Sequence, residues 1–146
     1  MKRHLNMLLA IIILVGAFAV NANAQNAGAQ KVVATIPFSF NVGNKNLPAG
    51  KYTITVLNPT SDRSVLQIRS ADGRSTAITN TNGVIGQLSE DAKLTFHRYG
   101  DRYFFAQAQM AGETTRLAAL TSSAERAQRQ MLALPRKPSV IVVMAE

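Results

Sequence analysis

Apolar and polar residues alternate with a period of two through most of the chain after Lys31. Within residues 32–40 every second side chain is apolar, ending with Phe38 and Phe40. This pattern predicts a half-buried β-strand with both phenylalanines facing inward. Pro37 has no N–H to donate to a neighbouring strand. We therefore expect this strand to lie at a sheet edge or to break at Pro37.

The same alternation predicts more short strands separated by turns. Residues 51–57 alternate directly after a turn at 47–50 that contains Pro48, and Asp72-Gly73 is typical of a tight hairpin. Further strands are predicted at 65–69, 75–79, 93–99, 103–110 and 114–120. The strand at 103–110 should place four residues on one face, namely Phe104, Ala106, Ala108 and Met110. Residues 80–90, rich in glycine and asparagine, are assigned to no element.

A change to helical spacing follows at 122–134. Ser122 is a candidate N-cap, and Glu125 three residues later completes a capping box. Glu125 and Arg129 are spaced for an ion pair, and Pro135 ends the helix. The apolar positions of this helix are Ala124, Ala127, Met131 and Leu134. We expect the helix to dock on the sheet, the alternative being an amphipathic helix that seeks a membrane surface.

These elements predict a mainly β fold. The expected architecture is an antiparallel β-sandwich or a partly open β-barrel of seven or eight strands with one C-terminal α-helix. The apolar segment 139–144 should form a last strand at a sheet edge, either in its own sheet or in that of a neighbouring molecule. A single domain, 31–146, accounts for all of these elements.

The first 24 residues predict a secretory signal peptide. Lys2 and Arg3 precede an uncharged apolar run at 7–20, and Ala22 and Ala24 are the small residues that a signal peptidase reads. The run is shorter than the ~20 residues that span a bilayer. We therefore expect cleavage after Ala24, no membrane span afterwards, and a flexible start at 25–30.

Composition narrows the chemistry. The chain has no cysteine, which excludes disulfides, thiolate metal sites and a cysteine nucleophile. Its formal net charge is +8, to which the predicted signal peptide contributes two positive charges. A basic excess favours anionic partners, such as envelope lipids, acidic polysaccharides or nucleic acid. The basic residues are scattered along the chain, which leaves open a solvated basic surface or a dedicated polyanion site.

One segment, 97–103, gathers side chains suited to binding. Its candidate site residues are His97, Arg98, Tyr99, Asp101, Arg102 and Tyr103. Arginine forks and aromatic faces predict a binding edge for an anionic or sugar-like ligand. The alternative is a tight hairpin in which Tyr99 and Tyr103 cover the barrel end and Asp101 pairs with a neighbouring arginine.

Catalytic motifs are sparse. His97 is the only histidine after the predicted signal peptide, so it cannot supply a zinc site built from two or three histidines. The sequence has no G-x-S-x-G or S-x-x-K motif and no phosphate-binding glycine loop. We expect no enzymatic activity, no cofactor and no metal; a hydrolase with His97 as its base is the catalytic alternative. Export argues against nucleic acid as a partner.

Two motifs resemble a group of small secreted proteins of unknown function from Gram-negative soil bacteria. The first combines residues 37–43 (PFSFNVG) with 47–52 (LPAGKY), and the second is the hairpin 94–104 (LTFHRYGDRYF), followed by Ala124-Glu125-Arg126. The resemblance covers about 35–130. It implies export to the periplasm or the medium and brings no activity, cofactor or catalytic residue.

The sequence thus predicts an exported, non-enzymatic envelope or extracellular β-module that binds a partner or builds structure. The expected partner is an anionic envelope polymer or another envelope protein. The alternative is a carrier of a small ligand or lipid within the barrel. The side chains expected to line such an interior are Phe38, Phe40, Tyr52, Phe96 and Phe104.

Overall fold

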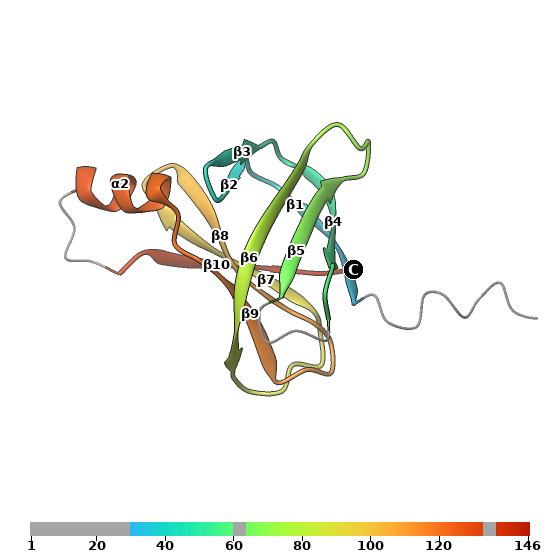
Figure 1. Ribbon diagram of the computed structural model, residues 1–146. Helices are drawn as coiled ribbons and strands as arrows, with labels where there is room; N and C mark the ends of the chain where they lie inside the picture. The colour runs from blue at the N-terminus through green and yellow to red at the C-terminus, as the bar shows by residue number, and fades with distance from the viewer. Residues whose placement is uncertain (1–29, 60–63, 133–136) are drawn as a thin grey trace, which may run out of the picture.

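The computed structural model describes residues 30–59, 64–132 and 137–146 (Figure 1). The predicted signal peptide and residues 25–29 of the predicted flexible start lie outside these ranges. The described residues form ten strands and one helix, labelled α2. The strands are β1 (Lys31–Ile36), β2 (Phe40–Val42), β3 (Lys45–Leu47), β4 (Gly50–Val56), β5 (Val65–Ser70), β6 (Thr76–Ile85), β7 (Lys93–Tyr99), β8 (Arg102–Gln109), β9 (Thr115–Ala119) and β10 (Ser139–Met144).

The mainly β prediction is confirmed, and the strands form two sheets that share β6. Sheet A comprises β1, β4, β5 and the first half of β6. Sheet B comprises the second half of β6 with β9, β8, β7, β10, β2 and β3. β6 pairs with β5 through residues 76–80 and with β9 through 81–85. Figure 1 shows β6 passing from one sheet to the other. The prediction left residues 80–85 unassigned, because glycine and asparagine are rare in strands.

The two sheets meet again where Glu146, which follows β10, contacts β1, and this contact makes a partly open barrel. The Glu146 N–H donates to the Val33 carbonyl oxygen at 2.9 Å. The Glu146 carboxylate accepts a hydrogen bond from Thr35 Oγ1 at 3.0 Å and lies 2.6 Å from Lys51 Nζ. The contact joins the edges at a single point rather than along a ladder.

Pro37 breaks the first predicted strand, as expected. β1 ends at Ile36, and the chain resumes as β2, which pairs with β3 and meets β8 in a parallel contact at Asn41 and Phe104. β2 and β3 raise the strand number above the seven or eight predicted. The terminal strand β10 pairs with β7 of its own chain.

The barrel interior is filled by interlocking aromatic rings. The Phe96 ring lies 5.2 Å from Phe38, 5.3 Å from Phe40 and 5.9 Å from Phe105, each in an edge-to-face arrangement. Phe40 in turn contacts Tyr52 at 5.2 Å between ring centroids. Such pairs contribute about 0.5–1.5 kcal/mol each beyond the area that they bury.

The predicted inward position of Phe104 is wrong. Phe96 is opposite Phe105, whereas Thr95 is opposite Gln107, so Ala106 is an extra residue in β8. A bulge of one residue reverses the faces of the side chains on either side of it. Phe105 therefore joins the core, and Phe104 is buried on the outer face of sheet B.

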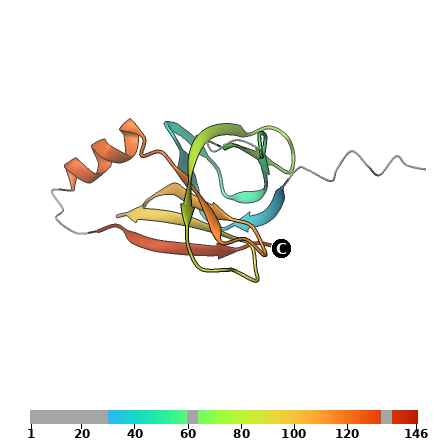
Figure 2. The ribbon, with the colours of Figure 1, turned by 60° about the horizontal axis from the view of Figure 1, so that its bottom comes forward.

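Helix α2 (Ser123–Met131) forms near its predicted position and lies at one end of the molecule (Figures 1 and 2). The Ser122 hydroxyl accepts a hydrogen bond from the Glu125 N–H at 3.0 Å, which confirms the N-cap. The expected ion pair of Glu125 with Arg129 does not form, and Met131 is 79% exposed. The buried residue of the helix is Glu125, so a carboxylate and not an apolar stripe faces the sheet. Leu134 and Pro135 lie outside the described residues.

No helix in the part of the chain that the structure describes is long and apolar enough to cross a membrane.

Candidate functional site

The predicted site residues lie on the β7–β8 hairpin, and helix α2 lies against the outer face of this hairpin. His97 is opposite Phe104 and Tyr99 is opposite Arg102 in the β7–β8 register. The Tyr99 and Phe104 rings contact each other at 5.8 Å between centroids, and both residues are buried. The hairpin thus presents a buried aromatic surface to the helix that carries Glu125.

One carboxylate oxygen joins the helix to the hairpin. Glu125 Oε1 lies 2.8 Å from His97 Nδ1 and accepts a hydrogen bond from the Tyr99 hydroxyl at 3.1 Å. Burial raises the pKa of Tyr99 to about 12, with the charge of Glu125 and its hydrogen bond acting in the same direction. A buried carboxylate is tolerated where such partners satisfy it.

The remaining hairpin side chains also have partners within the molecule. Arg102 donates to Gln128 Oε1 at 3.0 Å, and the Arg98 guanidinium lies 5.6 Å from the centre of the Tyr103 ring. Tyr103 stacks on Phe38 with 4.0 Å between ring centroids. Asp101 is exposed and forms no ion pair with any described residue, so the expected pairing with an arginine is absent there.

The polar side chains of the hairpin bind helix α2 and do not form a catalytic or metal-binding cluster within the described residues. Within the described ranges, the hydrogen-bonding partner of the His97 ring is Glu125, and the ring forms no hydrogen bond with a serine or threonine hydroxyl. In the same ranges, no three histidine, aspartate or glutamate side chains gather closely enough to hold a metal ion. The geometry suits attachment of the helix to the sheet.

A second feature, which the sequence did not reveal, is a groove on the outer face of sheet B. Two hollows, of about 490 and 360 Å³, share Lys93, Gln109 and Arg116, and we call their combined surface the outer groove. Leu88 borders the first hollow, and Val140 borders the second. The three shared residues come from three strands, so only the folded sheet brings them together.

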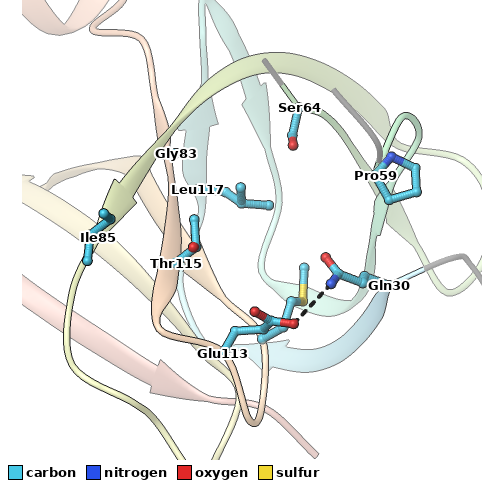
Figure 3. Close-up of a pocket in the computed structure, with 9 residues that line it drawn as sticks. Gln30, Pro59, Ser64, Gly83, Ile85, Glu113, Thr115 and Leu117 are labelled. Carbon is cyan, nitrogen blue, oxygen red and sulfur yellow. Dashed lines mark hydrogen bonds between the residues drawn. The ribbon is translucent and has the colours of Figure 1, made fainter. Parts of the chain in front are cut away.

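A third feature is a pocket at one end of the barrel, of about 460 Å³ (Figure 3). Leu117 and Met110 supply apolar surface, and Glu113 Oε1 accepts a hydrogen bond from Gln30 Nε2 at 3.4 Å. The pocket lies outside the aromatic cluster, because none of the clustered rings lines it. Its polar lining is unlike the apolar cavity that a lipid would need.

No protein-family model, curated protein or solved structure matches the chain.

Proposed function

We propose that the protein is an exported, non-enzymatic β-module of the cell envelope or the extracellular space that binds an anionic partner on its outer surface. The observation that carries this proposal is the charge of the outer groove. Lys93 and Arg116 line it, and none of its lining residues is acidic. Cations without a neutralising acid attract and retain anionic ligands.

Export is supported by the sequence. The charged start at Lys2 and Arg3, the apolar run at 7–20 and the small residues Ala22 and Ala24 form the three regions of a signal peptide. The resemblance to small secreted proteins agrees with this proposal.

A non-enzymatic role is supported by the structural contacts of the two side chains best suited to acid–base chemistry, His97 and Glu125. His97 contacts Glu125 and lies at the base of a helix, and no hydrogen bond joins its ring to a serine or threonine hydroxyl within the described residues. The best carboxylate for general acid–base work, Glu125, already accepts two close partners. These groups hold the helix, and the outer surface remains for recognition.

The test is a binding survey with purified mature protein. Polygalacturonate, polyphosphate and vesicles that contain phosphatidylglycerol serve as anionic probes, and dextran is the neutral control. We expect at least one anionic probe to bind at low salt and to be released as the ionic strength rises, since added salt screens exposed charges. Absence of binding to every anionic probe at low salt would contradict the proposal.

The carrier alternative rests on the barrel-end pocket. Its volume, about 460 Å³, falls within the range of small-molecule sites. Native mass spectrometry separates the two functions, because a carrier purified from its source retains a ligand that leaves on unfolding. We expect the mass of the bare chain, since the aromatic rings Phe40, Phe96 and Phe105 fill the barrel interior.

A further inference from the structure

Three residues of the outer groove form one row across sheet B. Lys93 is opposite Gln109 in the β7–β8 register, and Gln109 is opposite Arg116 in the β8–β9 register. The next row, Leu94, Ala108 and Leu117, is buried in the core. Because neighbouring residues on a strand face opposite sides, the row of Lys93, Gln109 and Arg116 faces outward.

The spacing of this row places two cations on either side of a neutral amide. Adjacent strands are about 4.8 Å apart, so the backbones of Lys93 and Arg116 are separated by about 10 Å. Gln109 is buried and its amide nitrogen donates to the carbonyl oxygens of Gln87 and Glu113, both at 2.8 Å. The amide is therefore fixed, while both long cationic side chains are able to reach a ligand above it.

The Arg116 guanidinium occupies space that is open only because residue 86 is a glycine. A β-carbon at residue 86 would lie 2.5 Å from Arg116 Nε and 2.9 Å from Nη2, so only glycine leaves room for the guanidinium. The Nε atom is buried and has no hydrogen-bond acceptor among the described residues. A buried unpaired N–H costs about 1–3 kcal/mol and is rare in native proteins. This guanidinium is thus placed without an acidic partner of its own.

The rest of the groove offers groups that suit a sugar. Thr95 and Gln107 add a hydroxyl and an amide beside the row. The exposed aliphatic side chains of Val140 and Val142 flank one hollow, and that of Leu88 flanks the other. Hydroxyl-binding groups, aliphatic surface and two separated cations are arranged along an open face rather than in a closed cavity.

We infer that the row of Lys93, Gln109 and Arg116 is the binding site for an acidic polysaccharide. Its carboxylates lie against Lys93 and Arg116, and its hydroxyls hydrogen-bond to Thr95 and Gln107. This inference rests on the proposed function, since it names the site and the ligand class for an anion-binding module. Arginine matches carboxylate geometry through its planar fork, whereas lysine supplies a point charge.

The experiment measures binding of polygalacturonate to two matched double variants. K93Q/R116Q removes two positive charges from sheet B, and K31Q/R69Q removes two from the outer face of sheet A. Both pairs line surface hollows, but the hollow of sheet A also contains Asp72. We expect K93Q/R116Q to weaken binding at least tenfold and K31Q/R69Q to weaken it less than threefold. Equal losses would overturn the site and leave the proposed function intact.

Two single variants test the geometry without removing charge. In G86A the new methyl group displaces the guanidinium, and in R116K the charge remains but the fork is lost. We expect each to weaken polygalacturonate binding at least threefold at a temperature where circular dichroism shows that both variants are fully folded. Wild-type affinity in both variants would overturn the role assigned to Arg116.

Two further probes test whether the ligand is an acidic polysaccharide. Methyl-esterified polygalacturonate keeps the sugar and loses the charge, and we expect it not to bind. Polyphosphate keeps the charge and lacks the sugar, and we expect weaker binding that depends less on Thr95 and Gln107. Polyphosphate binding as tight as that of polygalacturonate, with the same loss in K93Q/R116Q, would overturn the polysaccharide. Failure of the wild-type protein to bind any anionic probe would overturn the proposed function as well.

Discussion

The outer faces of the two sheets differ in how their charged side chains are neutralised. On sheet A, Lys31 and Arg69 line a hollow together with Asp72. The Ser70 hydroxyl and the Arg74 N–H donate to Asp72, and these hydrogen bonds lower the pKa of its carboxyl. Sheet A therefore keeps an ionised acid beside its cations over the whole physiological pH range.

Sheet B separates its charges along the strands. At the hairpin end, Glu125 of helix α2 is buried against the sheet and is bound by His97 and Tyr99. Toward the other end of β7, Lys93 shares the outer groove with Arg116 and with no acid. An acid that is held by structural contacts thus leaves the cations on the same face free to bind a ligand.

The largest effect is expected from Glu125→Ala. The substitution leaves the His97 and Tyr99 polar atoms without their partner under helix α2, which costs about 1–3 kcal/mol of unfolding free energy. Urea unfolding followed by circular dichroism measures this loss. The matched change on sheet A, Asp72→Ala, removes an exposed carboxylate, and we expect it to leave the helix signal intact. A Glu125→Ala protein as stable as the wild type would show that the carboxylate does not attach the helix.

A smaller loss is expected from Gly100→Ala in the β7–β8 hairpin. Gly100 has φ +61°, and a β-carbon there would meet no atom within 4 Å. The cost is therefore purely conformational, about 1–2 kcal/mol. Gly100→Asn should recover part of it, since asparagine adopts this conformation more readily. Equal stability of the alanine variant and the wild type in thermal unfolding would refute this explanation.

The two sheets can also be compared through the pKa of one buried tyrosine on each, since these groups ionise only well above neutral pH. The pKa of Tyr99 is raised to about 12, so it exceeds the value of about 10 in the unfolded chain. The stabilisation from protonated Tyr99 is complete below pH 10 and is lost as the pH rises toward 12. On sheet A, burial and then the charge of Asp72 raise the pKa of Tyr52.

A spectrophotometric titration of tyrosinate absorbance measures this ionisation. Tyr99→Phe should remove a step near pH 12, and helix α2 of the wild-type protein should detach over the same range. Tyr52→Phe is the control on sheet A and should leave that step in place. A titration curve that Tyr99→Phe does not change would contradict the buried hydrogen bond to Glu125.

The smallest expected effect is a gain in polygalacturonate affinity from a substitution on sheet A. Asp72→Asn leaves Lys31 and Arg69 without an acid in their hollow, which makes sheet A more like sheet B. In the K93Q/R116Q background we expect polygalacturonate affinity to rise about twofold, as is typical of a single exposed charge. Isothermal titration calorimetry measures the change. A fall in affinity would mean that Asp72 does not oppose anion binding.

Local pattern predicted the strands well because each strand has one buried face. The alternation of Tyr52, Ile54 and Val56 follows directly from a core on one side of β4. The bulge at Ala106 could not be predicted, because an extra residue in β8 becomes visible only when β7 is paired with it. Because apolar residues both precede and follow Ala106, the alternation in β8 fits a core on either face of the strand.

The candidate site was predicted only in part for the same physical reason. The hairpin 97–103 is continuous in sequence, so its cluster of charged and aromatic residues was visible. Glu125 was interpreted as a capping residue, since its sequence neighbours give no sign of a sheet beneath it. Lys93 and Arg116 are 23 positions apart, and cross-strand pairing alone places them in one row.

The most direct test of the account is a titration of isotopically labelled protein with oligogalacturonate, followed by backbone amide NMR. We predict shift changes centred on Lys93, Gln109 and Arg116, with Gly86 beside them and little change on sheet A. Changes confined to the barrel-end pocket, around Met110, Glu113 and Leu117, or spread evenly over both sheets, would contradict recognition at the outer groove.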